Sequence, residues 1–305
     1  MSRSSANVLL LLAGAMWGMG FVAQATAMQD IGPFLFVALR FTVASIFVAP
    51  FAWLESRREQ RRDRAPLSPL ELRRFALIGL VLFAGMGTQQ VGLLTTSVTH
   101  SGFLTGLYVV FTPLVAVALY RDWPHRVIWP ASALALIGIA LLSGVGHGGA
   151  LAGDLLTVCS AVFWALQVVL IGRFVRASGR PLMLSLVQFA VTALLAGLVA
   201  LITEPFVLTD VRAALPSVLY AGIFASGIAF TLQVIGQRYT TAPQAAIFLS
   251  SEAPFAALFG YLLMGEQIAQ IGLVGCALIL CAMLLVELYP QYTHYRRSRL
   301  AAKES

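Results

Sequence analysis

The chain has 305 residues, of which 59% are hydrophobic and only 11% are charged, and its mean hydropathy is +0.86. Soluble domains carry about 25% charged residues, and disordered chains combine low hydrophobicity with high charge, so this composition excludes both classes. The net charge of +7 does not indicate a nucleic-acid partner, because the basic residues lie in short loops between apolar runs. The single lysine, Lys303, excludes a Walker A loop, so ATP binding by that route is not expected.

Apolar runs long enough to cross a membrane recur along the whole chain. A spanning helix needs about 20 apolar residues, and no run shows the period-two alternation of a membrane strand. We therefore predict an all-α membrane protein with ten transmembrane helices and no extramembrane domain. The predicted spans are residues 6–28, 33–54, 73–95, 100–120, 126–145, 153–175, 181–203, 214–237, 243–264 and 267–289.

The first run also allows a second interpretation, as a secretory signal peptide. Arg3 precedes an apolar core, and Ala25-Thr26-Ala27 has the small residues of a cleavage site. The run is long for a signal peptide, however, and it contains Trp17 and Gln24. It also has a counterpart later in the chain, so the membrane-spanning interpretation is preferred.

Basic residues in the connecting loops predict the orientation, since Lys and Arg gather on the cytoplasmic side of a membrane. With the N-terminus inside, 18 of the 20 basic residues fall on the inner side, Arg212 alone falls outside and Arg40 lies within a span. We therefore predict a multi-pass protein of the inner cell membrane with both termini cytoplasmic. The basic loop 57–64 is expected to contact anionic lipid rather than a protein.

Weak matches in consistent order indicate that five spans are duplicated. The matched residues are Trp17 with Trp164, Pro33 with Pro181, and Pro113 with Pro254. Because five is an odd number, the two halves must have inverted topology, which places a substrate site between them near the membrane midplane. We predict a first repeat over residues 1–148, a second over 149–290, and a basic cytoplasmic tail over 291–305.

Several motifs resemble those of the drug/metabolite transporter superfamily, specifically its EamA-type ten-helix members. The motifs are Trp17-Gly18, Leu39-Arg40-Phe41, the run from Gly102 to Tyr108 continuing to Pro113, and Ser250-Ser251-Glu252-Ala253-Pro254 with Gly265-Glu266. The resemblance covers nearly the whole chain and implies export or exchange of small metabolites, often amino acids, driven by gradients. Aromatic amino acid exporters are one similar group. The second half departs from symmetry at Gln188, where the first half has Arg40.

Polar groups within the spans are the candidate site residues, because such groups are costly in a membrane and mark pathways by default. Glu252 lies about ten residues into its span, close to the midplane by helix rise. It could contact a substrate ammonium group or couple transport to protons. The alternative is a structural hydrogen bond to a neighbouring helix, for example to backbone freed by Pro254. The candidates for substrate binding are Trp17, Gln24, Gln89, Thr105, Tyr108, Trp164, Gln167 and Glu252.

Two other ionisable residues are candidates for coupling or charge pairing together with Glu252. Arg40 could bind a substrate carboxylate, although snorkelling to the outer interface or structural pairing with an acid is the preferred interpretation. His100, at the start of the fourth span, could sense pH, but a solvated histidine is the more ordinary role.

Small residues and prolines in the spans predict where helices approach or bend. Gly18 and Gly106 belong to small-xxx-small pairs that allow close helix contact. Together with Pro113 and Pro254 they are the candidate hinges for alternating access. Close packing without motion is the alternative for each glycine, just as bundle packing is the alternative to substrate stacking for Trp17 and Trp164.

Together these features predict a secondary transporter that exports or exchanges small metabolites by alternating access. Amino acids, aromatic ones included, are the first expected class, because rings, hydroxyls, amides, an acid and a base suit a small zwitterion and not a phosphorylated compound. A multidrug or organic-cation exporter of the same fold is the alternative, and a channel is another. An intramembrane enzyme is less favoured, because no nucleophile–base pair or metal set is evident. We expect no catalytic residue, metal or cofactor; the partners are a small substrate and the bilayer.

Overall fold

The computed structural model describes residues 1–304 apart from residue 64 and residues 96–100, 102–103, 144–150 and 265–268. All regular elements in these described residues are helices, which confirms the predicted all-helical class. They are α1 (Arg3–Ala27), α2 (Pro33–Gln60), α3 (Pro69–Gly92), α5 (Tyr108–Tyr120), α6 (Ile128–Ser143), α7 (Leu151–Ser178), α8 (Pro181–Thr203), α9 (Leu208–Tyr220), the π-helix η1 (Ala221–Ile228), α10 (Ala229–Gln237), α11 (Ala242–Leu249), α12 (Glu252–Met264) and α13 (Gln270–Glu304).

Eight helical segments of the described chain are long and apolar enough to cross a membrane by length and composition. Two shorter apolar helices, Leu104–Tyr120 and Ile128–Leu142, correspond to the predicted fourth and fifth spans. Large apolar side chains such as Ile202 and Leu201 are more than three-quarters exposed on the outside of the bundle, where lipid would cover them. The protein is therefore a multi-pass membrane protein.

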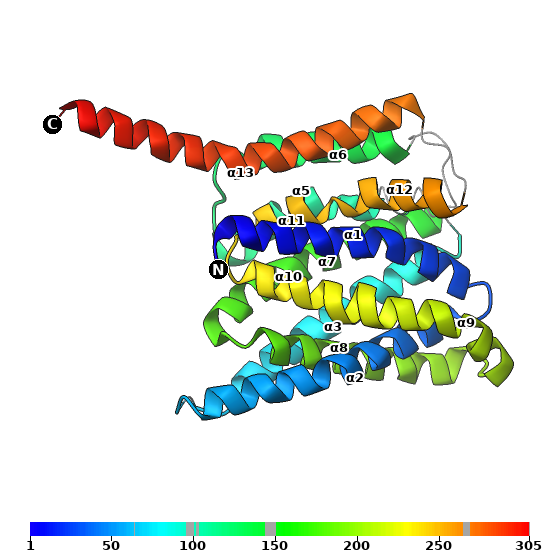
Figure 1. Ribbon diagram of the computed structural model, residues 1–305. Coiled ribbons are helices and arrows are strands. Elements are labelled where there is room, and N and C mark those ends of the chain that lie inside the picture. The colour runs from blue at the N-terminus through cyan, green and yellow to red at the C-terminus, as the bar shows by residue number, and fades with distance from the viewer. Residues whose placement is uncertain (64, 96–100, 102–103, 144–150, 265–268, 305) are drawn as a thin grey trace.

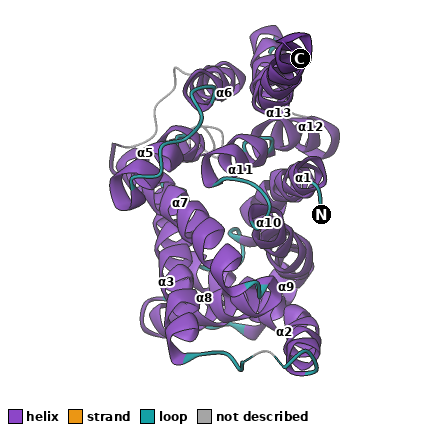
Figure 2. Cartoon of the chain, turned by 90° about the vertical axis from the view of Figure 1, so that its left-hand side faces the viewer, coloured by secondary structure: helices purple, strands orange, loops and turns teal. Residues whose placement is uncertain are grey.

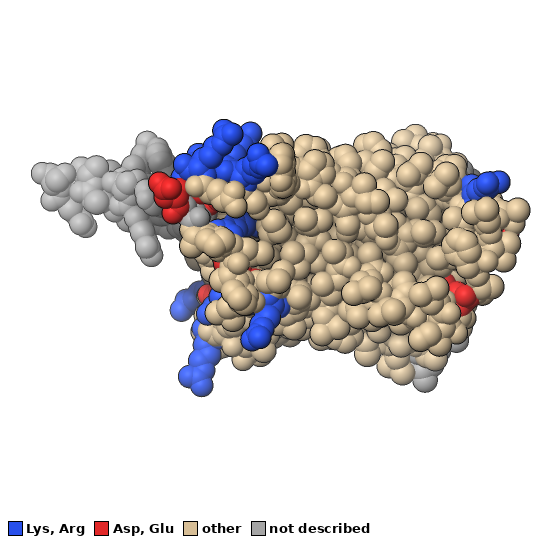
Figure 3. All heavy atoms as spheres, turned by 90° about the horizontal axis from the view of Figure 1, so that it is seen from below, with Lys and Arg blue, Asp and Glu red and all other residues tan. Residues whose placement is uncertain are grey.

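The helices lie side by side along one common direction, and the chain begins and ends at the same end of the bundle (Figure 1). Blue Arg side chains gather at that end on the face seen in Figure 3, whereas a broad band of uncharged atoms covers the middle. α13 follows α6 along one edge of the bundle, and α2 and α8 form the opposite edge (Figure 2). The tail predicted over 291–305 continues α13 as a helix to Glu304.

Helix contacts between the two halves of the chain pair off in a regular way. α2 packs against α8, and α6 against α13, so the second and fifth spans each contact their counterpart. α3 contacts α7, while α1 contacts the segment formed by α9, η1 and α10. If each span is replaced by its counterpart in the other half, the contact between the third and sixth spans becomes the contact between the eighth and first spans. Both contacts are present, so the two halves pack against each other in the same way.

Two predicted spans are interrupted rather than continuous. The fourth bends at Leu107, directly after Gly106 and before α5, and the ninth breaks at Ser250 and Ser251 between α11 and α12. Pro254 explains the second break, because it has no N–H to donate to the Ser250 carbonyl four residues earlier. The Ala253 N–H donates to that carbonyl instead, at 3.2 Å.

The eighth span contains the other departure from a regular α-helix, the π-helix η1. A π-helix widens the turn and shifts carbonyls and side chains out of the regular register, and such segments are frequent at functional sites. In this protein η1 faces α1 and α2. The apolar sequence predicts the span but gives no signal for this local change.

The predicted close approach at Gly18 lies between α1 and α12. A Cβ atom on Gly18 would stand 2.6 Å from the Phe255 Cβ and from the Ala256 backbone nitrogen. A Cβ on Gly106 would stand 2.9 Å from the Ile139 Cδ1. Both glycines therefore occupy tight helix contacts, and their part in bending during transport stays a prediction.

Candidate functional site

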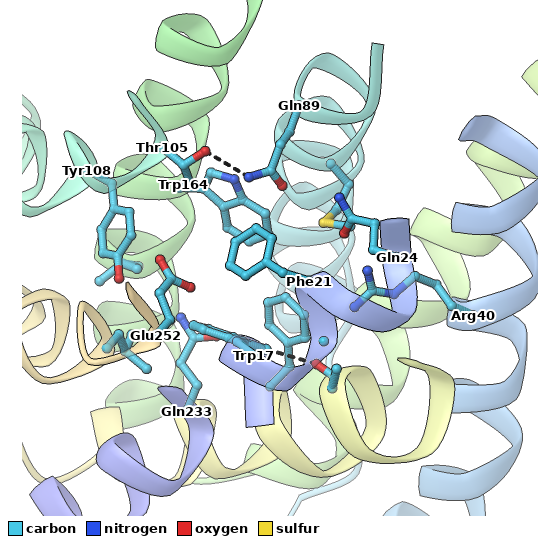
Figure 4. A pocket seen from close by; sticks show the side chains of 16 residues that line it. Trp17, Phe21, Gln24, Arg40, Gln89, Thr105, Tyr108, Trp164, Gln233 and Glu252 are labelled. Atoms are coloured by element: carbon cyan, nitrogen blue, oxygen red, sulfur yellow. Dashed lines mark hydrogen bonds between the residues drawn. The ribbon is translucent and has the colours of Figure 1, made fainter. Parts of the chain in front are cut away.

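A cavity lies inside the bundle between α1, α2, α3, α5, α7, the η1–α10 segment and α12, and it opens around two tryptophans (Figure 4). It contains about 580 Å³ of atom-free space, including its open mouth. Of the predicted substrate-binding residues, those that line it are Trp17, Gln24, Gln89, Thr105, Tyr108, Trp164 and Glu252.

Gln167 is the predicted binding residue that does not line the cavity. Its side chain is fully buried, and its Nε2 donates to the Gln188 Oε1 at 3.3 Å. Its Oε1 accepts from the Nε2 of Gln233 at 3.1 Å, and Gln233 does line the cavity. Gln167 therefore lies behind Gln233 and not at the cavity surface, where the sequence pattern predicted it. Gln233, which we missed, carried the same signal, an amide within an apolar run.

An aromatic cluster forms the middle of the site. The ring of Phe230 lies 4.7 Å from that of Trp17 and 5.9 Å from that of Trp164, measured between centroids. The Trp17 Nε1 donates to the Ala225 carbonyl in η1 at 2.8 Å. The Trp164 Nε1, in contrast, is buried without a hydrogen-bond partner among the described residues. The two tryptophans thus differ: the Trp17 N–H is hydrogen-bonded within the protein, whereas the Trp164 N–H has no partner among the described residues and could donate to a solute.

Arg40 lines the same cavity and is only 5% exposed. Its Nε donates to the Ser226 Oγ in η1 at 2.9 Å, and its guanidinium carbon lies 5.4 Å and 5.3 Å from the ring centroids of Phe36 and Phe41. Within the described part of the chain no carboxylate pairs with it. The Arg40 side chain therefore does not snorkel to the outer interface, because it is buried and turns into the bundle toward η1 and the cavity. Pairing with an acid finds no partner among the described residues.

Glu252 is the first residue of α12, directly after the helix break, and its carboxylate faces the cavity. The first turn of a helix stabilises a negative charge, because free backbone N–H groups and the helix dipole point toward it. The Tyr108 hydroxyl points toward this carboxylate (Figure 4). Tyr108 is itself the first residue of α5, so both residues directly follow a break in their span. No basic residue that the structure describes forms an ion pair with Glu252.

Amides and hydroxyls line another part of the cavity. The Gln89 Nε2 on α3 donates to the Thr105 Oγ1 at 2.8 Å, and both side chains are buried. Gln24 is also buried and lies near Arg40 in Figure 4. Amides and hydroxyls both donate and accept hydrogen bonds, so these groups can bind polar groups of a solute.

Other predicted residues lie apart from the cavity or outside the described residues. Pro113 lies within α5 and Pro254 in the first turn of α12 at the break, so only Pro254 directly marks an interruption. His100 falls outside the described residues, and so does Gly265-Glu266. The cavity also includes apolar residues that no sequence pattern distinguished from ordinary core, among them Phe21, Met86 and Phe230.

One family profile matches each half of the chain separately. The sequence profile of the EamA-like transporter family matches residues 4–144 and again residues 151–288. The family therefore matches nearly the whole chain, and the resemblance seen in the motifs is confirmed.

Curated relatives extend over the same length. An "Uncharacterized transporter" of Archaeoglobus fulgidus is 31% identical over 287 residues, which cover 94% of this chain and 87% of the relative. A "Probable amino-acid metabolite efflux pump" of Salmonella typhimurium is 26% identical, covering 93% of this chain and 94% of the relative. Because these relatives are named as transporters or pumps, the comparisons confirm a transporter rather than an enzyme.

A solved crystal structure has the same fold. It superposes with a TM-score of 0.78 over 96% of this chain and 99% of the other, at 21% sequence identity. At this level of identity the likeness establishes the fold alone.

Proposed function

The chain belongs to the EamA-like transporter family, and from that premise we propose that it is a secondary transporter that exports or exchanges small zwitterionic metabolites, amino acids first. The solute would bind in the cavity around Trp17 and Trp164. Alternating access would open this cavity to each side of the membrane in turn.

The main support for this proposal is that one cavity contains both a cation, Arg40, and an acid, Glu252, and that neither forms an ion pair with any residue that the structure describes. Each buried charge costs about 2.5–3.5 kcal/mol in a membrane on insertion scales, so charges that remain unpaired have a use. A solute with one positive and one negative group can compensate both. The name of the Salmonella typhimurium relative, a probable amino-acid metabolite efflux pump, supports the same substrate class.

The arrangement of the helices supports inverted halves, residues 1–148 and 149–290, with the cavity between them. The contacts of the first half map onto those of the second when the halves are exchanged, and the family profile matches each half separately. The Arg-rich loops gather at the end where the chain starts and finishes. By the positive-inside rule this end is cytoplasmic, which supports a location in the inner cell membrane.

Glu252 is the proposed coupling residue as well as a binding residue. A carboxylate at the start of α12 can take up a proton when the positive group of the solute leaves, and it can release the proton when that group returns. Proton and solute would then compete for one site, which links their movements. His100 remains a second candidate for coupling, on sequence grounds alone.

An organic cation is the second candidate substrate, because Glu252 shares the cavity with the faces of Trp17 and Trp164, which attract cations. Arg40 in the same cavity opposes a solute with a net positive charge. The amino-acid proposal is therefore preferred.

Counterflow in proteoliposomes tests the proposed function. Vesicles with purified protein are preloaded with one amino acid, amine or sugar, and accumulation of the same compound in labelled trace amount is followed. We expect transient, saturable accumulation with amino acids, reduced at least tenfold by Glu252→Gln. Asp30→Asn, which changes an exposed acid in the turn between α1 and α2 that does not line the cavity, is the matched control and should transport normally.

Other outcomes contradict the proposal in distinct ways. Accumulation with amines alone would favour the organic-cation exporter. Flux that never saturates, with no accumulation of label, would favour a channel. An Asp30→Asn protein as impaired as Glu252→Gln would show that loss of any acid disturbs the protein.

A further inference from the structure

We propose that the cavity selects solutes whose ammonium and carboxylate groups stand at opposite ends of an apolar or aromatic spacer, so that ω-amino acids bind better than their α-amino isomers. This inference rests on the proposed function, because it concerns the substrate of the same cavity. The reasons are the positions of Arg40 and Glu252 in the cavity and the aromatic side chains that lie between them.

The positive pole is Arg40, held in a fixed direction. Its Nε is used by Ser226, and the Phe36 and Phe41 rings lie beside its guanidinium group. The two Nη nitrogens have no hydrogen-bond partner among the described residues, and the side chain lines the cavity. An arginine with its Nε occupied and both Nη groups free presents an edge that suits a carboxylate.

The negative pole is Glu252, on a different helix. Its carboxylate faces the cavity beside the Tyr108 hydroxyl, and no described basic residue lies within 4.0 Å of it. Tyr108 can donate a hydrogen bond to one carboxylate oxygen and leave the other for a solute. This pole suits an ammonium group.

Aromatic side chains separate the two poles. In Figure 4, Glu252 and Arg40 lie on opposite sides of the cavity, with Trp17 and Phe21 between them. The Trp17 ring packs on the Phe230 ring, with 4.7 Å between their centroids, and both residues line the cavity, so this part of the site is apolar. A methylene chain or a ring fits such a surface, and a third charge does not.

This separation discriminates between isomers. In an α-amino acid the ammonium and carboxylate groups are attached to the same carbon, so a molecule that places its carboxylate on Arg40 also brings its ammonium near the guanidinium group. That contact is repulsive, and Glu252 stays unpaired. In an ω-amino acid each group meets the opposite charge, and the spacer covers the aromatic surface.

Isomer pairs test the inference without changing the protein. Each pair, such as 5-aminopentanoate with 2-aminopentanoate or 6-aminohexanoate with 2-aminohexanoate, has the same atoms and net charge and differs in charge separation. The measurement is the concentration of each unlabelled compound that halves counterflow of a transported amino acid. We expect the ω isomer to be at least tenfold more potent at one chain length, and potency to fall at shorter and longer lengths.

Single-charge compounds assign the poles. In the counterflow that each variant retains, pentanoate should inhibit wild type and Glu252→Gln at similar concentrations but lose at least tenfold in potency with Arg40→Gln. Pentylamine should show the converse pattern. If either variant fails to fold, the isomer comparison on the wild-type protein still decides.

Two results would overturn the inference, and they are distinguishable. If α-amino acids show counterflow and their potency equals or exceeds that of the ω isomers, charge separation does not select the substrate, and the proposed amino-acid transport stands. If neither series shows counterflow in folded protein, the proposed function itself fails, and this inference fails with it.

Discussion

Glu55, on α2, caps the N-terminus of α8, and Glu204, directly after α8, caps the N-terminus of α2. Glu55 lies near the C-terminal end of α2 and accepts two backbone N–H groups from the first turn of α8; Glu204 follows α8 and accepts two from the first turn of α2. The bonds run from Leu182 and Met183 to Glu55 at 3.1 and 2.9 Å, and from Phe34 and Leu35 to Glu204 at 2.8 and 2.7 Å. The antiparallel pair is therefore fastened at both ends by equivalent residues of the two halves.

Replacing either carboxylate should weaken this pair. Glutamine has one carbonyl oxygen in place of two carboxylate oxygens and carries no charge for the helix dipole, so Glu55→Gln and Glu204→Gln should each lower the free energy of unfolding by about 1 kcal/mol. The double variant should lose about the sum, because the caps lie at opposite ends of the pair. Denaturation midpoints of the detergent-solubilised protein measure both effects.

The matched control is Asp30→Asn, which alters an exposed acid in the turn between α1 and α2. It should leave the midpoint unchanged. A double cap variant no less stable than either single one would contradict independent caps at the two ends.

Long apolar runs between Arg-bearing loops predicted ten spans, because a helix satisfies its own backbone hydrogen bonds within lipid. Eight described helical segments are long and apolar enough to cross a membrane, and two shorter apolar helices match the fourth and fifth runs. The run 181–203 coincides with α8, whereas α2 extends six residues beyond its predicted end at 54. Arg57 and Arg58 lie in that last turn, where apolar periodicity no longer marks a helix but basic residues complement its dipole. Apolar composition therefore predicts which residues lie within the membrane, but it does not predict where the helix ends.

The site was predictable by residue type and only partly by position. Polar and aromatic residues within the spans predicted eight of the lining residues, Arg40 included. Gln167 and Gln233 show the limit of this reasoning, because both are amides in apolar runs and helix rotation decides which one meets the cavity. That rotation depends on packing between distant segments. The same holds for Arg40, whose contact with Ser226 arises from the π-helix in a span 186 residues away.

Gly18 should tolerate no side chain. An added methyl group would meet the backbone of α12 and force α1 away, so Gly18→Ala should cost about 1–3 kcal/mol of unfolding free energy. Gly197→Ala is the control, because a Cβ there would have only an ordinary 3.9 Å contact with the Ala38 Cβ. Alanine favours helix, so this variant should be neutral or slightly stabilising. Thermal unfolding of both proteins in the same detergent decides, and equal midpoints would contradict tight packing at Gly18.

The two tryptophans should respond differently to replacement by phenylalanine. Trp17→Phe removes a hydrogen bond to the Ala225 carbonyl, whereas Trp164→Phe removes an N–H that has no partner among the described residues. Trp17→Phe should therefore lower stability by about 1 kcal/mol more than Trp164→Phe. Trp164→Phe should act on transport instead, with a several-fold higher KM, if its N–H binds the solute. Paired unfolding and counterflow assays separate the effects, and identical losses in both variants would contradict this division.

Gln167 and Gln233 provide the corresponding test for the amides. Gln167→Leu removes the middle of a three-glutamine chain and leaves groups on both Gln233 and Gln188 without their partner, whereas Gln233→Leu leaves only one. Interhelical hydrogen bonds in membranes average about 0.6 kcal/mol, so Gln167→Leu should cost about 1 kcal/mol and Gln233→Leu about half of that. Gln233 lines the cavity and Gln167 does not, so KM should rise more with Gln233→Leu. A larger KM effect from Gln167→Leu would mean that the buried amide, rather than the one at the cavity surface, controls binding.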